Sequence, residues 1–429
     1  MPQEQASKSA EAGVAGFVRK YWLIGFALQP LVRFFLLAAS IGTVAGPFRA
    51  ERSFWLTCWF LECAVILAAA ASGFSLAGFF RKLNRGAAAL AAIWIGAIVI
   101  STALAEYPGP ALRGALQWIM HGYFAVSAWY LISRDPAGAA RSLERFARLG
   151  PWVIAATGLL AAACVFRIGL ASELNFALHL PGFAHLRHTG YIFAPAIALS
   201  LYGLASRKGG GWEPAALLAL NTGLCLWFGS RGPFLGLIAG LAVAILLFVE
   251  FRRPAFLLQA GASLAAGAVL SLVVPSPAKG GFSALGRLFG SGDDADGVSS
   301  GRVAIWKETW SLLFDRPLFG HGSEQFQQVS TLASNFYRHP HDFVLQVLFD
   351  WGFVGGGAFL GMLAFALAAA LRGLGEGTVE CRRLGIFGAA TMLGFALVDG
   401  ILFYPYTIAL TVIFLCFAIA PRDTAAKPA

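Results

Sequence analysis

Residues 299–356 read SSGRVAIWKETWSLLFDRPLFGHGSEQFQQVSTLASNFYRHPHDFVLQVLFDWGFVGG. This is the longest part of the chain without a membrane-like composition. It begins with an arginine-led amphipathic segment, continues through a glycine turn and a His-Pro-His triplet, and ends in apolar sequence. The remaining sequence is predicted to be a scaffold that places a few arginines beside this stretch.

Outside this stretch the chain is strongly apolar. Of its 429 residues, 58% are hydrophobic and 13% are charged, whereas a soluble domain has about 25% charged residues. This composition predicts a polytopic membrane protein whose surroundings include membrane lipid. The six cysteines lack metal-ligand spacing and are expected to be small buried hydrophobic side chains.

About twelve apolar segments have the length of roughly 20 residues that a bilayer core requires. They lie near 22–42, 54–74, 87–105, 114–133, 151–170, 190–206, 212–229, 233–250, 255–274, 343–371, 384–402 and 405–420. The predicted fold is therefore all-α. Residues 1–274 would supply about nine transmembrane helices, residues 275–341 a large outer loop with an amphipathic helix, and residues 342–429 the last three helices and a tail.

The basic residues indicate the orientation of this bundle. More than half of the 32 lysines and arginines fall on one predicted face, with at least two in every segment there. These segments lie near 8–20, 81–85, 134–148, 207–208, 252–253, 372–383 and 422–427. The positive-inside rule then places both termini in the cytoplasm and the large loop outside, in the periplasm of a Gram-negative cell. The N-terminus shows no cleavable signal, and this charge placement argues against nucleic-acid binding.

The few basic residues predicted on the outer side are informative. Arg231 lies in FGSRGPFLG between two apolar segments, and Arg187 lies in HLPGFAHLRHTGYIF. A charge at such a junction is costly unless it is paired or functional, although either arginine alone is also compatible with an interfacial position. None of the seven histidines is predicted to be cytoplasmic. Arginines and titratable bases therefore gather at one face, where a site for an anionic substrate needs them.

Ser299 or Ser300 is predicted to cap a helix that begins near Arg302. An apolar stripe in this helix is expected to lie on the membrane or on the bundle, and it comprises Val303, Trp306, Trp310 and Leu313. The helix dipole disfavours a cation in the first turn. Arg302 is therefore better explained by an anion shared with the free N–H groups, the alternative being an arginine that simply faces water.

The His-Pro-His triplet precedes the return to apolar sequence. Pro340 keeps His339 extended, so His341 is predicted at or just before the start of a helix. Either histidine alone is compatible with a structural role. As metal ligands the pair lacks a third partner at a convincing spacing. The acidic tip at 293–296 fits no complete calcium loop, so no metal is expected.

In combination, these motifs resemble the O-antigen ligase and polymerase superfamily of envelope polysaccharide enzymes. SRG, GR-x3-W, PLFGHG and HPHDFVLQVLFDWGFVG follow in order over roughly residues 228–356. The most specific pattern of the ligase branch is His, then Asn, Ser or Gln, nine residues, Gly, two residues, and Gly, Thr or Tyr. Here it reads His341, Asp342, Gly352 and Gly355, with Asp342 in place of the amide or hydroxyl.

The resemblance implies glycosyl transfer at the periplasmic face of the bacterial inner membrane, without metal, cofactor or nucleotide sugar. The donor would be a glycan on undecaprenyl diphosphate. The acceptor would be a sugar hydroxyl of the lipid A core for a ligase, or of another lipid-linked repeat unit for a polymerase.

The resemblance also suggests roles for particular residues. Arg231 and Arg302 match the family pattern and would stabilise the leaving diphosphate, and Arg187 is added from its position alone. A neutral histidine suits proton removal from the acceptor hydroxyl. His341 is the first choice for this base and His339 the second.

Asp399, in LVDGILFYPY, is predicted to orient the base or bind the acceptor, the alternative being a structural ion pair. A transporter or flippase is the competing class, because twelve spans with both ends inside are common there. The lack of a visible repeat between the two halves and the site-like outer loop favour an enzyme.

Overall fold

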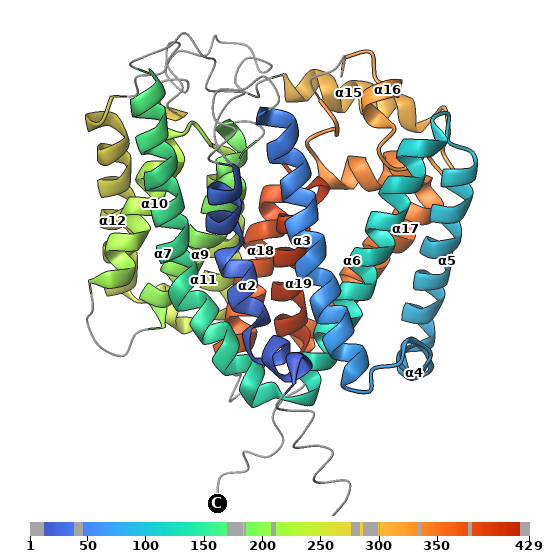
Figure 1. Cartoon of the computed structure of the whole chain (residues 1–429), viewed down its shortest axis with the longest axis horizontal. Coiled ribbons are helices and arrows are strands. Elements are labelled where there is room, and N and C mark those ends of the chain that lie inside the picture. Colours follow the sequence, from blue (N-terminus) through green and yellow to red (C-terminus); the bar gives the residue numbers. More distant parts are fainter. Residues whose placement is uncertain are drawn as a thin grey trace, which may run out of the picture.

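The computed structural model describes residues 13–37, 46–169, 183, 186–206, 212–275, 284–285, 299, 301–332, 337–375 and 380–420. Within these ranges the regular structure is helical, and no strand occurs. Figure 1 shows long helices packed side by side, with α15 and α16 across one end of the bundle. The predicted all-α fold is confirmed.

Every apolar segment predicted from the sequence coincides with a helix. These helices are α2 (Val14–Leu37), α3 (Gly46–Ala71), α5 (Arg85–Ala103), α6 (Pro108–Arg134), α7 (Pro136–Gly169), α9 (Gly190–Ala205), α10 (Glu213–Trp227), α11 (Gly232–Leu247), α12 (Pro254–Val273), α17 (Phe343–Arg372), α18 (Glu380–Ala396) and α19 (Pro405–Ile419). The shorter elements are α4 (Leu76–Lys82), η2 (Leu186–Thr189), η3 (Val249–Arg252), α15 (Arg302–Leu313), α16 (Phe326–Val329) and η4 (Ile401–Phe403).

Four of these helices, α5, α7, α12 and α17, are long and apolar enough to cross a membrane. Helices α9, α11, α19 and the Trp55–Ala71 part of α3 are also apolar but shorter. The chain is thus a multi-pass membrane protein, and the total of about twelve spans stays a prediction. Helix α4, which carries the basic Arg81, lies at the opposite end of the bundle from α15 and α16 (Figure 1).

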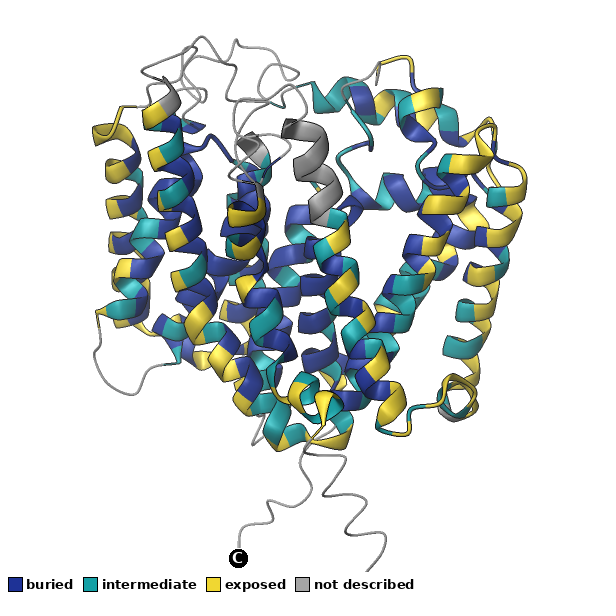
Figure 2. Cartoon of the chain, in the orientation of Figure 1, coloured by how far each residue is buried: buried dark blue, intermediate teal, exposed yellow. Residues whose placement is uncertain are grey.

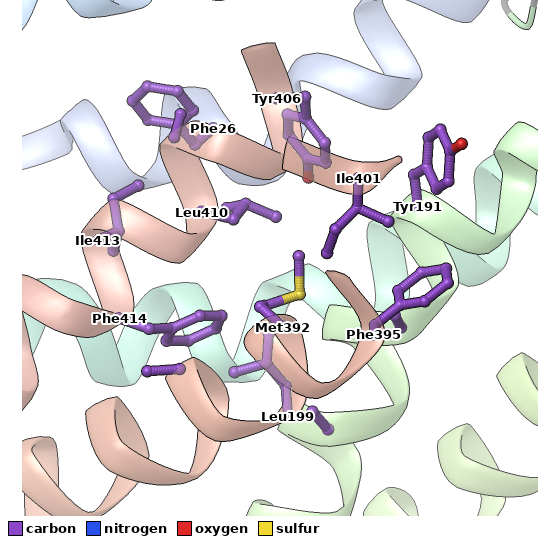
Figure 3. Packing of buried hydrophobic residues seen from close by; sticks show 14 of the residues in the cluster. Phe26, Tyr191, Leu199, Met392, Phe395, Ile401, Tyr406, Leu410, Ile413 and Phe414 are labelled. Carbon is purple, nitrogen blue, oxygen red and sulfur yellow. The ribbon is translucent and has the colours of Figure 1, made fainter. Parts of the chain in front are cut away.

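Helices α18 and α19 pack against each other in the middle of the bundle, and α9 and α11 pack against α18. Figure 3 shows side chains from α2, α9, α18, η4 and α19 meeting there. Small residues allow the close approach: a Cβ on Gly236 of α11 would lie 2.5 Å from the carbonyl oxygen of Thr391 in α18. Exposed residues lie mainly on the outward faces of the outer helices (Figure 2).

The amphipathic helix forms as predicted, but most of the predicted stripe is not the face that the helix buries against the protein. Helix α15 begins at Arg302 after Gly301, whose φ is +82°. The Ser299 hydroxyl accepts a hydrogen bond from the Val303 amide at 3.4 Å. The residues that α15 buries are Ile305, Thr309 and Leu313. Of the predicted stripe, Leu313 is buried while Trp310 is 51% exposed, because Ile305 and Leu313 are the residues that pack towards Phe349 of α17.

Helix α17 is broken at Gly352, where φ is +66° and ψ is −172°. A Cβ at this position would lie 2.3 Å from the carbonyl carbon of Leu318, so only glycine fits. Beyond the break, the Phe353 amide donates to the Pro317 carbonyl at 2.7 Å, and the Val354 amide to the Leu318 carbonyl at 3.1 Å.

The carbonyl groups before the break are also paired. Those of Phe349 and Asp350 accept from the His321 and Gly322 amides at 2.8 and 2.9 Å. The His321 ring stacks on Phe349, and its Nε2 contacts the Leu312 carbonyl at 2.9 Å. The PLFGHG turn therefore satisfies the backbone groups that the broken helix releases, as an apolar environment requires.

Candidate active site

The carboxylate of Asp399 is the centre of the candidate site. Asp399 follows α18 in the turn before η4, and its side chain receives four donors. Its Oδ1 accepts from the Gly400 amide at 2.8 Å, the Tyr191 hydroxyl at 3.2 Å and His341 Nδ1 at 3.1 Å. Its Oδ2 accepts from Arg302 Nη2 at 2.9 Å. This one carboxylate thus joins α9, the N-terminus of α15, the start of α17 and the end of α18.

Electrostatics keep this carboxylate ionised. Burial raises the pKa of Asp399, but the Arg302 guanidinium and the hydrogen bond from His341 lower it by more. The net pKa lies well below the usual range of an aspartic acid. Asp399 is therefore an anion at neutral pH, which fixes the proton of the His341 ring on Nδ1 whenever that ring is neutral.

His341 has a strained backbone at the mouth of this site. Its φ is +57°, a left-handed conformation that is uncommon for a residue other than glycine. The next residue, Asp342, is the N-cap of α17, and its side chain accepts from the Leu345 amide at 2.8 Å. His341 thus stands immediately before the helix, as the preceding proline predicts. Among the described residues, none forms a hydrogen bond with its Nε2, and its side chain is 18% exposed.

His339 is more deeply placed than His341, with 3% of its surface exposed. Its ring lies so close to the backbone of Gly400 that a Cβ there would overlap it. His339 Nδ1 accepts a hydrogen bond from the His341 amide at 3.3 Å. Burial, and next the charge of His341, lower the pKa of His339 well below its usual value. His339 is therefore a neutral ring that supports the turn carrying His341.

The SRG turn between α10 and α11 lies against the same carboxylate. Arg231 is the N-cap residue of α11, and Gly229 before it has a φ of +86°. A Cβ on the following Gly232 would lie 3.4 Å from Asp399 Oδ2 and 2.4 Å from the Phe395 ring. The turn therefore approaches Asp399 through a backbone position that only glycine allows.

The sequence reasoning missed an aromatic cluster on the α9 side of the carboxylate. The rings of His188 and Tyr191 stack with their centroids 5.0 Å apart, and both lie about 5 Å from the Tyr404 ring. The Tyr404 hydroxyl and His188 Nε2 are 3.3 Å apart. The motif HTGYIF contains a signal for this cluster, because His and Tyr three residues apart share one face of a helical turn.

Most of the predicted site residues come together in space. His339, His341, Asp399 and Arg302 form one cluster, and the turn of Arg231 adjoins it. The backbone of Arg187 belongs to η2, but its side chain lies outside the described residues. The acidic tip at 293–296 also lies outside them.

Residues 215–360 match the O-antigen ligase family. This part of the chain is similar to an O-antigen ligase domain. The resemblance inferred from the sequence is thereby confirmed. No curated protein matches the chain.

The O-antigen ligase match extends from α10 into α17 and includes Arg231, Arg302, His339 and His341. Asp399 lies outside it and reaches the matched residues through the fold. The departure from the ligase pattern at Asp342 also has a structural explanation. Its carboxylate caps α17, and asparagine and serine serve the same purpose.

The chemistry available at this site is acid–base and anion-binding chemistry. The His341–Asp399 pair offers an oriented imidazole, and Arg302 offers guanidinium N–H groups beyond the one bound to Asp399. Within the described part of the chain, no group of three or more His, Cys, Asp or Glu side chains has an arrangement suited to a metal ion.

Proposed function

We propose that this protein transfers a glycan from undecaprenyl diphosphate to a sugar hydroxyl of the lipid A core, at the periplasmic face of the inner membrane. The family match supports a lipid-linked glycan and an acceptor as substrates in general. The observation that carries the proposal is the pairing of one carboxylate, Asp399, with both Arg302 and His341. A base and an anion-binding cation are thereby held side by side.

In the proposed reaction, His341 is the general base. Its Nδ1–H donates to Asp399, so Nε2 is the nitrogen that accepts the proton of the acceptor hydroxyl. The acceptor oxygen forms the new bond to the anomeric carbon while the bond from that carbon to the diphosphate oxygen breaks. Asp399 orients the ring and stabilises the imidazolium that results.

The leaving group is undecaprenyl diphosphate, which gains negative charge as the bond breaks. Arg302 and Arg231 are proposed to stabilise that charge through guanidinium hydrogen bonds. Arg302 lies at the N-terminus of α15, where the helix dipole adds favourable potential for an anion. We further propose that Arg187, one residue before His188, contributes to donor binding.

A polymerase is the alternative within the same chemistry, with a second lipid-linked repeat unit as acceptor. A deletion strain examined by lipopolysaccharide gel and by analysis of lipid-linked intermediates separates the two. A ligase predicts uncapped lipid A core together with long undecaprenyl-linked chains. A polymerase predicts single-repeat intermediates. Unchanged lipopolysaccharide and unchanged lipid-linked intermediates would contradict both.

The orientation and the absence of a metal step are parts of the proposal that can be tested separately. A reporter fused within residues 285–297 should be active only outside the cytoplasm, and one within residues 374–380 only inside. EDTA should leave the turnover of purified enzyme unchanged. Cytoplasmic activity of the first fusion would contradict the proposed face, and loss of turnover in EDTA would contradict metal independence.

A further inference from the structure

Helix α15 and the turn after it carry a row of exposed apolar side chains that the proposed chemistry does not use. Trp310, Phe314 and Leu318 are 51%, 58% and 60% exposed. The Trp310 and Phe314 rings contact each other with centroids 5.7 Å apart. Neighbouring exposed apolar side chains of this size mark a surface that contacts a protein or a membrane.

This apolar row is continuous with the surface of two candidate membrane-spanning helices. The Phe314 ring contacts that of Phe353 in α17, with centroids 6.3 Å apart, and Phe353 is itself 43% exposed. The Arg316 guanidinium donates to the carbonyl of Leu104, just after α5, at 2.7 Å. Leu104 is also exposed. The row therefore extends the outward apolar surfaces of α5 and α17.

The other faces of α15 have different partners. Successive residues of a helix are rotated by about 100°, which separates three faces. Ile305, Thr309 and Leu313 are buried against the protein. Ser311 is exposed on the side of the buried face away from Trp310, and Asp315 is exposed in the turn that follows the helix. A helix with one protein-facing, one apolar and one polar face is suited to the boundary between membrane and water.

We infer that α15 lies in the membrane–water interface, with Trp310, Phe314 and Leu318 in contact with the lipid of the adjacent leaflet. The partner is the bilayer, because the apolar row continues the outward surfaces of two helices that are long and apolar enough to span it. Lys307 is exposed on the same flank as Trp310 and Phe314, where its ammonium group reaches the lipid phosphates.

The contact of α15 with lipid would also fix the position of Arg302 in the candidate site. The contact itself does not depend on the proposed reaction. Arg302 is the first residue of α15, so anchoring the helix fixes the height of this arginine relative to the lipid headgroups. For a donor whose diphosphate is attached to a membrane-embedded chain, this is the depth at which the charge lies. Anchoring would thus align the cation with the phosphates.

Spin labels on adjacent residues of α15 and of the turn after it test the inference directly. Single cysteines replace Trp310, Phe314, Ser311 or Asp315 in a chain in which the exposed Cys63 is serine. Each labelled protein is reconstituted into liposomes of phosphatidylethanolamine and phosphatidylglycerol. Collision rates with oxygen, which concentrates in lipid, and with a neutral nickel complex, which stays in water, are then measured. The parent without an introduced cysteine gives the background.

Labels at positions 310 and 314 should collide several-fold more with oxygen than with nickel, and labels at 311 and 315 should show the reverse. Equal nickel collision at 310 and 311 would overturn the inference, because α15 would then be surrounded by water. Protection of 310 and 314 from both reagents would also overturn it and would indicate a protein partner. The four positions are exposed, and the 314 label carries the test if the 310 variant folds poorly.

Discussion

Within the described part of the chain, two histidines each contact a carboxylate through Nδ1, and the two pairs lie in different surroundings. His341 Nδ1 lies 3.1 Å from Asp399, and His121 Nδ1 lies 2.9 Å from Glu62. The first pair is at the end of the bundle that carries α15, with side chains 18% and 12% exposed. The second joins α6 to α3 inside the bundle, with side chains 2% and 0% exposed.

Access and neighbouring charge distinguish the two pairs. Asp399 also binds Arg302, the Tyr191 hydroxyl and the Gly400 amide. In contrast, His121 Nε2 is buried without a hydrogen-bond partner in the described part of the chain. A histidine–carboxylate pair can act as a reactive base only where the second ring nitrogen can meet a substrate. The interior pair is interpreted as structural.

The largest expected effect is on turnover of the outer pair. His341→Ala removes the proposed base and should reduce the turnover of purified enzyme by about 10²–10⁴-fold, the usual contribution of general-base catalysis. The melting temperature should change less than in His121→Ala, because Asp399 keeps its hydrogen bonds from Arg302, Tyr191 and the Gly400 amide. His121→Ala, compared per folded molecule, should retain turnover. Equal losses of turnover in His341→Ala and His121→Ala would contradict the assignment of only the outer pair to catalysis.

The interior pair should instead determine stability. His121→Ala leaves the Glu62 carboxylate buried without its partner, which costs about 3–5 kcal/mol. Thermal unfolding in detergent measures this loss, and the double variant His121→Ala with Glu62→Ala should recover part of it. If the single variant unfolded like the wild type, water would have access to this pair and its assignment as structural would be wrong.

Variants of Arg302 test whether a cation beside the outer pair contributes to turnover. Arg302→Ala should lower turnover by roughly ten- to hundredfold, as expected for about 1.5–3 kcal/mol from a hydrogen bond to a charged group. Arg302→Lys should recover only part of it, because an ammonium group cannot contact Asp399 and a phosphate with the fork of a guanidinium. Steady-state turnover at saturating donor is the measurement. Full activity of Arg302→Ala would remove this residue from the mechanism.

A smaller effect is expected from the pH dependence of stability at His339. Because burial lowers the pKa of His339 in the folded protein, the unfolded chain binds the proton more readily. The folded protein therefore has its full stability above the ordinary histidine pKa of about 6.5, where the His339 ring is neutral in both states. The free energy of unfolding then decreases as the pH falls towards the pKa of His339 in the folded state, by at most about 1.4 kcal/mol per pH unit.

Melting temperatures of the wild type and His339→Gln between pH 7.5 and 5 test this expectation. The wild type should lose more stability than the variant as the pH falls. Parallel melting curves for the two proteins would show that His339 is not held as a buried neutral ring.

The sequence predicts the helices well because runs of about 20 apolar residues have few alternative structures. It also identifies Arg302, His341 and Asp399, since each interrupts an otherwise apolar or regular pattern. It offers the pairing of His341 with Asp399 only as one alternative, and it does not predict that Arg302 and Tyr191 bind the same carboxylate. His341 and Asp399 are 58 residues apart, and Tyr191 and Asp399 are 208 apart, and such contacts leave no local periodicity.

Local patterns also leave the orientation of the outer helix open. The apolar stripe of α15 is compatible with the membrane or the bundle, and the residues that the helix buries include Ile305 and Thr309, which lie outside that stripe. Which face of α15 is buried depends on the break at Gly352, because the broken α17 positions Phe349 against Ile305 and Leu313. A glycine within an apolar segment does not by itself reveal such a break.

The most direct test of the outer pair is the pH dependence of turnover at saturating donor, measured for the wild type and for His341→Gln. A general base must be neutral to accept a proton, so wild-type turnover should rise with pH. That rise should be absent in His341→Gln, with turnover low throughout and donor binding intact. Wild-type turnover that falls with rising pH, or near-normal turnover of His341→Gln, would contradict the assignment of His341 as the base.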